Sequence, residues 1–450
     1  MGNMITLNTM MLSAFNKVKA GFGVLFKFGV IDFACKIRYG QGYSFRDISL
    51  MYFLLYGVVS VNRFPFCLSK LSRWLKDVVK RSSSSIIVLT HDWGGGADSY
   101  LTNMINDTWS NMTVFVVRPT ETPRIINVNV YCNGRMSKEF LVKGLSFLSH
   151  INLNETEVVI NELIRWHQYD RSRAVSINSL MCLINEIIKV KKTLGAKLTY
   201  LVHDYYCVCP RYNLMSSTGC YCDSESDEKK CTSCLTDASF SILPLMGNTN
   251  ISDWRKTFSL LFSECYEIRT FSEDTYRRIR RCFPDISPTI LPHKQAYVFE
   301  RKPPITGGSL VVGVFGRIDK IKGAQIIIDL ARLLATQKPE AKIIVVGELL
   351  TDSKAPLPRN IAVLGRYKVA ELPKIIAKNG VNVAFMSSIV PETFSYVTQE
   401  LVALGVPLVS FNIGAPKDVV GNYDKGAVAQ EISAESALNA IIGLYEKIYA

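Results

Sequence analysis

Short apolar segments alternate with helical stretches in two series, and this pattern constrains the fold more than any other feature. The first series predicts strands at residues 86–89, 114–117, 125–130, 158–160, 198–202, 267–271 and 289–291. The second predicts strands at 310–315, 342–346, 361–364, 381–386 and 408–411. Helical stretches among them include 179–192, 254–263, 324–336, 368–378 and 434–449. Because such alternation is typical of parallel, doubly wound sheets, the sequence predicts an α/β fold with two Rossmann-like domains.

A linker with Pro and Gly, residues 302–308, separates the two series. The 450 residues are enough for two domains and an appendage. We therefore expect a helical N-terminal extension over residues 1–82, a first domain over 83–300 and a second over 301–450. Two such sheets would form a cleft at the carboxyl ends of their strands, where ligands of this architecture bind.

The net charge of +13 is concentrated in residues 1–82, where seven Lys and five Arg face three Asp, a net of +9. Within this extension, residues 66–81 have the spacing of a basic amphipathic helix. Such a helix fits an anionic membrane surface, where each basic residue contributes about 1 kcal/mol. The alternative is that the extension packs on the next domain. No nucleic-acid-binding motif accompanies the charge, so nucleic acid is not an expected partner.

The location expected from the sequence is the cytoplasm, peripheral on the cytoplasmic face of a membrane. No apolar run reaches the roughly 18 to 20 residues that a membrane-spanning helix needs. Lysines interrupt the first 30 residues, which therefore make a poor signal peptide. Without an export signal, the twelve cysteines are expected to be reduced thiols.

Two carboxylates, Glu392 and Glu400, lie eight positions apart in the stretch V-P-E-T-F-S-Y-V-T-Q-E-L. If a helix begins near Ser395, Glu400 lies roughly 7 to 8 Å further along its axis than Glu392, at about 1.5 Å per residue. The free backbone N–H groups from Ser395 through Tyr396 to Val397 would face an anion between the two acids. This spacing suits a diphosphate with a sugar at each end. The alternative is a surface helix with two exposed acids.

A basic loop, G-R-I-D-K-I-K-G, follows the first strand of the second series. Gly316 permits close approach of the backbone to a ligand, and Arg317 and Lys322 offer two cations at the edge of the sheet. Hydrogen bonds to charged groups contribute about 1.5 to 3 kcal/mol, so these cations should dominate diphosphate binding. The alternative is an exposed basic loop.

Glycines and a histidine follow strands of the first domain. The run T-H-D-W-G-G-G-A includes Gly95 and Gly96 and lies between the first strand and a probable helix. His203 and Asp204 follow the strand at 198–202. A lone histidine is more often structural, but one at the carboxyl end of a strand in this fold is well placed for a site.

From about residue 86 to the C-terminus, these motifs resemble those of retaining glycosyltransferases of the GT-B type, the "glycosyl transferases group 1" superfamily with its E-x7-E signature. The resemblance implies that Glu392 contacts the donor hexose and Glu400 the nucleotide ribose. It also implies that Arg317 and Lys322 bind the donor diphosphate.

The resemblance further implies that His203 lies near the transferred sugar and that Gly95 and Gly96 line the cleft opposite the diphosphate. It implies that Gly365 and Arg366 lie by the nucleotide base, and that the last helix, 434–449, crosses back to the first domain. The chain departs from the family pattern at Ser395, a position usually Gly, and at Asn382, one often Asp. These departures bear on the choice of donor.

Six cysteines lie between residues 207 and 234, in an insertion of the first domain. Four thiolates would suit a structural zinc ion, with Cys231 and Cys234 as one pair and Cys209 and Cys222 as plausible partners. Unligated thiols in a loop are the alternative, and disulfides rank third. Such a zinc would fix a flap beside the cleft, and no cofactor is expected to be required for catalysis.

The function expected from the sequence is a hexosyltransferase-like enzyme. It would transfer a sugar with retention from a nucleotide diphosphate sugar to a glycan or lipid-linked acceptor, in assembly of a surface polysaccharide such as lipopolysaccharide. The rivals are a phosphorylase or epimerase on the same fold and a non-catalytic scaffold. The presence of all four charged residues, Arg317, Lys322, Glu392 and Glu400, argues against a non-catalytic scaffold.

Overall fold

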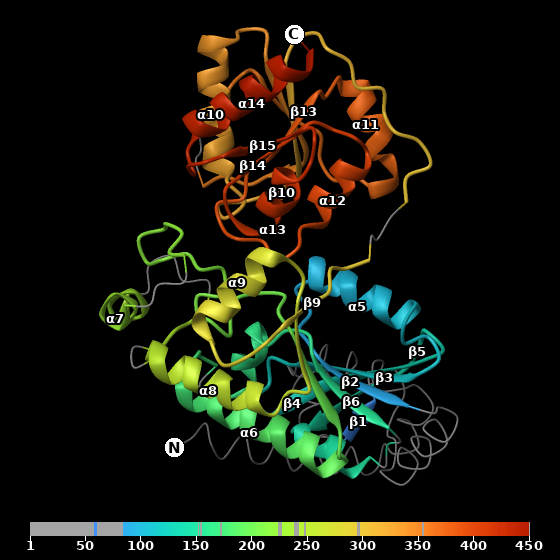
Figure 1. Cartoon of the computed structure of the whole chain (residues 1–450). Helices are drawn as coiled ribbons and strands as arrows, with labels where there is room; N and C mark the ends of the chain where they lie inside the picture. The colour runs from blue at the N-terminus through green and yellow to red at the C-terminus, as the bar shows by residue number, and fades with distance from the viewer. Residues whose placement is uncertain are drawn as a thin grey trace, which may run out of the picture.

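The computed structural model describes residues 58–60 and 84–449, apart from 152, 154, 172, 224–226, 238–242, 247–248, 295–297 and 353–354. These residues form two lobes, each built on its own sheet (Figure 1). The predicted extension over residues 1–82 lies outside the described residues, except for the short strand β1 (Val58–Ser60). In the part of the chain that is described, no helix is long and apolar enough to cross a membrane.

The first lobe has a sheet of order β1-β5-β4-β3-β2-β6-β7-β8-β9. Six neighbouring strands of this sheet, β3-β2-β6-β7-β8-β9, are parallel to one another, as predicted. They are β2 (Ser85–Leu89), β3 (Thr113–Pro119), β6 (Thr156–Ile160), β7 (Lys197–Leu201), β8 (Glu267–Thr270) and β9 (Thr289–Ile290). Their carboxyl ends therefore lie along one edge of the sheet, where the loops carrying His91, Glu162 and His203 begin.

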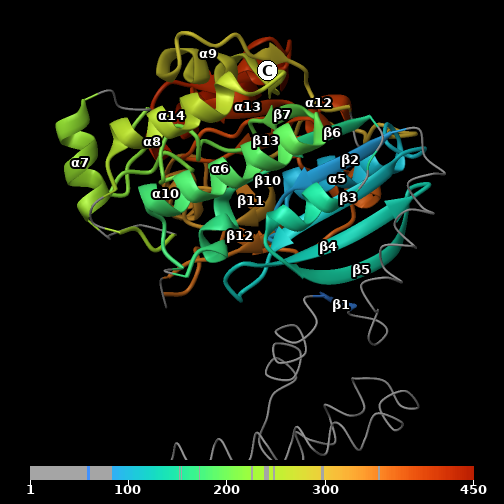
Figure 2. The same cartoon turned by 90° about the horizontal axis from the view of Figure 1, so that it is seen from below.

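The other side of this sheet departs from the predicted parallel arrangement. Strands β4 (Ile125–Cys132) and β5 (Arg135–Lys143) form an antiparallel hairpin, and β4 is antiparallel to β3. The turn between them is Asn133-Gly134, with both φ angles positive, which is the conformation of a tight two-residue hairpin. Figure 2 shows β3, β4 and β5 on the side of the lobe away from α7 (Glu228–Thr236) and α8 (Ile251–Ser263).

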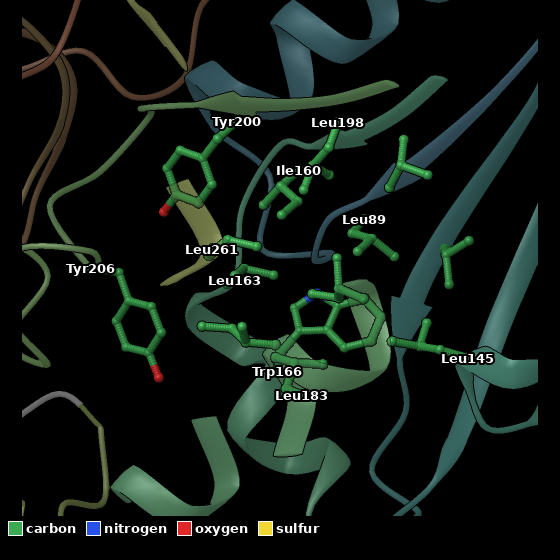
Figure 3. Close-up of a cluster of buried hydrophobic side chains, with 14 of the residues drawn as sticks. Leu89, Leu145, Ile160, Leu163, Trp166, Leu183, Leu198, Tyr200, Tyr206 and Leu261 are labelled. Carbon is green, nitrogen blue, oxygen red and sulfur yellow. The ribbon is translucent and has the colours of Figure 1, made fainter. Parts of the chain in front are cut away.

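Both faces of the first sheet are buried, because successive side chains of a strand point to opposite faces. Ile87 and Leu89 pack with α8 and α6 (Ile177–Leu194), whereas Ile86 and Val88 pack with α5 (Gly96–Asn106). Figure 3 shows Trp166 among the leucines of the first face. Its indole Nε1 donates a hydrogen bond of 3.1 Å to the Thr90 carbonyl. This bond anchors the start of the glycine-containing loop that follows β2.

The second lobe has a wholly parallel sheet of order β12-β11-β10-β13-β14-β15. Its strands are β10 (Val311–Ile318), β11 (Lys342–Leu349), β12 (Ile361–Val363), β13 (Val383–Met386), β14 (Leu408–Phe411) and β15 (Gly426–Ala429). Helices α10 (Ala324–Gln337) and α14 (Ala434–Tyr449) cover one face, and α11 (Leu372–Asn379) and α12 (Tyr396–Ala403) cover the other.

The predicted crossing of the last helix to the first domain is not observed. Helix α14 packs against α10 and against β13, β14 and β15 of its own lobe. Its buried side chains, including Leu438, Ile441 and Leu444, are part of the second core. Because its apolar side completes this core, α14 belongs entirely to the second lobe.

The two lobes meet where α9 (Glu273–Cys282) of the first lies against α13 (Gly414–Gly421) of the second (Figure 1). Asp418 of α13 accepts hydrogen bonds from the backbone N–H of Asp274 at 2.7 Å and from the Arg277 guanidinium at 3.0 Å. A second contact crosses the cleft, because the Thr393 hydroxyl donates to the His203 carbonyl at 2.9 Å. The carboxyl edges of the two sheets therefore face each other.

Candidate functional site: the cleft between the lobes

The basic loop after β10 is fixed against the loop after β13. Gly323 has a φ of +83° and immediately precedes α10, and a Cβ atom at this position would lie 2.0 Å from the Ser387 carbonyl oxygen. The Ser387 hydroxyl donates to the Lys322 carbonyl at 2.7 Å, and the Ile389 N–H donates to the Ile321 carbonyl at 3.0 Å. These contacts require glycine at position 323, and they place Lys322 next to the loop that carries Glu392.

Lys322 and Glu392 form an ion pair, with 2.6 Å between Nζ and Oε1. Burial alone would raise the pKa of Glu392, but the charge and hydrogen bond of Lys322 hold that pKa below its ordinary value. The backbone of Glu392 is fixed by Gly414 of α13, where a Cβ atom would lie 2.6 Å from the Glu392 nitrogen. Glu392 is therefore an ionised, fixed carboxylate.

Helix α12 begins as predicted, immediately after Ser395. Ser395 has a φ of +68°, a left-handed conformation that glycine adopts most easily. This conformation gives a physical reason why glycine would suit position 395 better than serine does. The Ser395 hydroxyl accepts a hydrogen bond from Thr398 at 2.9 Å. Ser395, Tyr396 and Val397 all line the cleft.

Arg317 is exposed and lines the cleft together with Gly316, whose φ is +106°. It has no ion-pair or hydrogen-bond partner among the residues that the structure describes. Its guanidinium is therefore available to bind an anion.

His203 forms the opposite wall of the cleft. Its ring stacks on Phe271 with centroids 4.5 Å apart and meets Tyr100 edge-on at 5.0 Å. Burial lowers the pKa of His203 well below its ordinary value, and the neighbouring His293 and His91 lower it further. His203 is therefore neutral, and its buried Nε2 has no hydrogen-bond partner in the described part of the chain.

The cleft holds about 400 Å³ and is lined by residues of both lobes. It brings together nine of the residues predicted from the sequence: Gly96, His203, Gly316, Arg317, Lys322, Glu392, Ser395, Tyr396 and Val397. Four others, Gly95, Glu400, Gly365 and Arg366, are not part of this lining. Gly95 is the residue preceding α5, with a φ of +93°.

The residues predicted to bind the nucleoside lie around a different part of the second lobe. Glu400 is 6% exposed within α12, and burial raises its pKa. Its charge contributes to a raised pKa of the nearby Tyr367, after the larger effect of burial. Arg366 follows Gly365 and donates to Glu348 at 3.1 Å. Their assignment to the ribose and the base stays a prediction.

Sequence reasoning missed Glu162, a buried acid on the first-lobe wall that forms an acidic pair with Asp204. Glu162 follows β6 and Asp204 follows His203 after β7, and both line the cleft. The pKa of Glu162 is raised by burial, and that of Asp204 is raised to about 7 by burial and by the charge of Glu162. The position of Glu162 directly after the carboxyl end of a parallel strand was the available signal.

The cysteines of the predicted zinc site lie in one insertion of the first lobe. Burial raises the pKa of the Cys209 thiol, and the nearby Cys222, Cys231 and Cys234 raise it further. The insertion is tied together by Arg211, whose Nη2 donates to the Cys234 carbonyl at 2.9 Å. Within the described residues, no group of three or more His, Cys, Asp or Glu side chains is arranged to hold a metal ion. The zinc site stays a prediction.

Comparison in sequence finds a family match within the second lobe. Residues 298–447 match the family model described as "Glycosyl transferases group 1". No curated protein matches the chain in sequence. The matched segment contains the basic loop, the Glu392 loop and all six strands of the second sheet. The predicted enzyme class, a glycosyltransferase, is confirmed by this match.

Comparison in structure extends over both lobes. A sucrose-phosphate synthase from Thermosynechococcus elongatus matches 81% of this chain and 90% of its own, with a TM-score of 0.50 and 11% identity. The pneumococcal O-GlcNAc transferase GtfA, in complex with UDP and GlcNAc, matches 81% of this chain and 93% of its own, with a TM-score of 0.50 and 10% identity. At such identities the likeness concerns the fold, and it confirms the predicted GT-B architecture. The chain thus has the GT-B fold, and its residues 298–447 match the model of the glycosyl transferases group 1 family.

Proposed function

We propose that the chain is a retaining glycosyltransferase that moves a sugar from a nucleotide diphosphate sugar to a glycan or lipid-linked acceptor. The observation that supports this most directly is the convergence of Arg317, Lys322 and Glu392 on one cleft, beside the first turn of α12. Cations and free helix N–H groups suit a diphosphate, and a fixed carboxylate suits sugar hydroxyls. The pneumococcal enzyme's complex with UDP and GlcNAc makes a UDP-sugar the first donor to test.

In the proposed reaction the bond between the donor's anomeric carbon and the β-phosphate oxygen breaks, and a bond from the acceptor oxygen to that carbon forms on the same face. The proton of the acceptor hydroxyl passes to the departing phosphate oxygen, so the chain supplies no nucleophile. Arg317, Lys322 and the N–H groups from Ser395 to Val397 stabilise the negative charge of the departing diphosphate. Glu392 holds the donor sugar, and His203 lies beside it.

The proposed setting is the cytoplasmic face of a membrane, in assembly of a surface polysaccharide. The support is the net charge of +9 in residues 1–82 and the amphipathic pattern of residues 66–81. A lipid-linked acceptor would be presented at such a surface.

The test is the variant Arg317→Ala, assayed with saturating donor. Electrostatic stabilisation of a departing anion is commonly the largest catalytic contribution, so we expect kcat to fall by about 10²-fold or more. Arg332→Ala is the matched control, because Arg332 lies on the exposed side of α10 and pairs with Asp329. A variant of Arg317 with near wild-type turnover would refute the proposed mechanism.

The same assay separates the rival activities. A glycosyltransferase gives a glycosylated acceptor and free nucleotide, a phosphorylase gives a sugar phosphate, and an epimerase gives an epimer of the sugar. A scaffold gives none of these products and does not hydrolyse donor.

A further inference from the structure

The charges of the cleft are divided between the two lobes. The second lobe lines it with Arg317, Lys322 and Glu392, whereas the charged residues that the first lobe contributes are Glu162 and Asp204. The histidines of the first-lobe wall, His203 and His293, do not offset these acids, because burial lowers their pKa values and leaves them neutral. One wall of the cleft therefore suits an anion, and the facing wall does not.

Glu162 is held in a fixed orientation by His91. The Nδ1 atom of His91 accepts the backbone N–H of Trp93 at 3.0 Å, so the ring proton lies on Nε2. This Nε2 atom lies 2.7 Å from Oε2 of Glu162 and donates to it. Glu162 is 8% exposed and His91 is 4% exposed. The imidazole of His91 thus orients the Glu162 carboxylate. Burial lowers the pKa of His91, but the hydrogen bond to Glu162 and the charges of Glu162, Asp204 and Asp98 raise it above its ordinary value.

Asp204 adds a second carboxylate beside Glu162. Its Oδ1 atom accepts the backbone N–H of Tyr206 at 2.6 Å. Neither Asp204 nor Glu162 has a lysine or arginine partner among the described residues. One imidazole, that of His91, does not balance two acids, so Glu162 and Asp204 on the wall of the cleft indicate a ligand that donates hydrogen bonds or carries positive charge.

The donor cannot be that ligand if its diphosphate binds the cations of the second lobe, because Glu392 then faces its sugar. We infer that Glu162 and Asp204 bind the acceptor sugar next to its attacking hydroxyl. They select acceptors with hydroxyl or amino groups there and reject acceptors with a carboxylate or phosphate. This inference rests on the proposed function, since it assigns the two acids of the cleft that the proposed donor contacts do not use.

The physical basis of the selection is that a carboxylate can only accept hydrogen bonds. A hydroxyl donates to it and an ammonium group also pairs with its charge, whereas a carboxylate or phosphate of the ligand repels it. Facing like charges in a partly desolvated site should reduce affinity by about tenfold or more.

The test measures binding of three sugar probes to the full-length protein with UDP present, by ligand-observed NMR titration at pH 8. The probes are methyl glucoside, methyl glucosaminide and methyl glucuronide. We expect the glucuronide to bind at least about tenfold more weakly than the other two. In the isosteric double variant Glu162→Gln, Asp204→Asn, we expect this difference to fall to threefold or less. Glu435→Gln, an exposed acid of α14, is the control that should keep the wild-type order.

The inference is overturned if the wild-type protein binds the glucuronide as tightly as the glucoside, if it binds none of the probes, or if the double variant keeps the wild-type order. UDP binding, measured on the same samples, reports on the proposed function separately. Absence of sugar selectivity in the wild-type protein, with UDP still bound, refutes the acceptor assignment alone. Failure of the wild-type protein to bind UDP would instead count against the proposed donor.

Discussion

Asp204 has a raised pKa of about 7, caused by burial and by the charge of Glu162. In the unfolded chain this carboxyl should ionise near its ordinary pKa of about 4. Between these two pH values the folded protein holds a proton that the unfolded chain lacks. The contribution of Asp204 to the free energy of unfolding is therefore fully present below pH 4 and is lost as the pH rises through 7.

We predict that Asp204→Asn is more stable relative to wild type at pH 8 than at pH 5. Asparagine cannot ionise, so the variant avoids the cost of a buried charge at the higher pH. The difference should be about 1 kcal/mol or more in the free energy of unfolding, measured by urea denaturation at both pH values. Asp424→Asn, at an exposed position, is the control. An equal effect of Asp204→Asn at both pH values would contradict a raised pKa.

For single residues, the sequence predicts those members of the site that lie together in a short motif. Arg317 and Lys322 lie six residues or fewer from the glycine that opens their loop, and Glu392 lies just before the helix it was expected to precede. Glu162 was missed because its partner, His91, is 71 positions away in the sequence and meets it only after β2 and β6 pair. The ion pair of Lys322 with Glu392 could not be derived from the sequence for the same reason.

Helices α9 and α13 form the contact that holds the lobes together at one side of the cleft. Asp418 accepts the Asp274 N–H in the first turn of α9, so a residue of the second lobe caps a helix of the first. The Arg277 guanidinium that also binds Asp418 is half-exposed, so this ion pair should stabilise the contact little. Most of the stabilisation by Asp418 should come from the helix cap, at about 1 kcal/mol.

For Asp418→Ala we predict a rise in the KM for donor of about fivefold, with kcat changed by less than twofold. Loss of the cap favours the open arrangement, in which Arg317 and Glu392 no longer face His203. Steady-state kinetics measure both constants. The control is Asp424→Ala, at an exposed position three residues after the end of α13. A fall in kcat with an unchanged KM would show that this contact does not control closure.

The cysteine insertion is attached to α9 as well. Arg278 of α9 forms ion pairs with Asp274 of the same helix and with Asp223 of the insertion. Tyr212 and Asn213, from the same insertion, line the cleft. A metal ion that fixed the insertion would therefore also fix part of the wall of the cleft.

If the predicted zinc site exists, purified full-length protein should contain about one zinc ion per chain. Cys234→Ser should lose the metal and lower the melting temperature, because structural zinc contributes directly to folding. Cys182→Ser, at an exposed position on α6, should do neither. Elemental analysis and thermal denaturation provide the two readouts. Wild-type protein purified without chelators and free of zinc would rule out the site.

The sequence predicts most elements from their apolar runs, and its errors have physical causes. Strand β5 was not predicted because its first three residues are exposed and its first five include only one apolar residue, Met136, so it lacks a long apolar run. The Asn133-Gly134 turn before it was the available signal, since this pair favours a hairpin. Strand β15 was missed because its sequence, G-A-V-A, is short and rich in small residues.

At the scale of the whole molecule, the two series of strands predict two sheets, and the structure contains them. The position of α14 could not be predicted from its sequence, because an apolar side on a helix does not say which lobe will cover it. The closed contact between α9 and α13 was equally unpredictable, since it depends on the relative placement of two lobes that fold around separate cores.

The basic extension bears on the whole molecule, because it would fix the orientation of both lobes relative to a membrane. We predict that replacing its five basic residues between 70 and 81 with alanine reduces binding to vesicles containing anionic lipid. These residues are Lys70, Arg73, Lys76, Lys80 and Arg81. At about 1 kcal/mol for each basic residue near the surface, the partition coefficient should fall by about 10²-fold or more at low salt. Sedimentation with vesicles of phosphatidylcholine and phosphatidylglycerol measures it.

The control removes the same number of charges from exposed lysines of the second lobe. These are Lys338, Lys374, Lys378, Lys425 and Lys447. If binding followed net charge alone, both variants would lose it equally, and the extension would have no special role. If the extension docks on the membrane, the first variant loses binding and the control keeps most of it. The wild-type protein should also bind less as salt rises, because the Debye length falls from about 30 Å at 0.01 M to about 8 Å at 0.15 M. Wild-type binding equal on neutral and anionic vesicles would show that charge does not attach the protein to the surface.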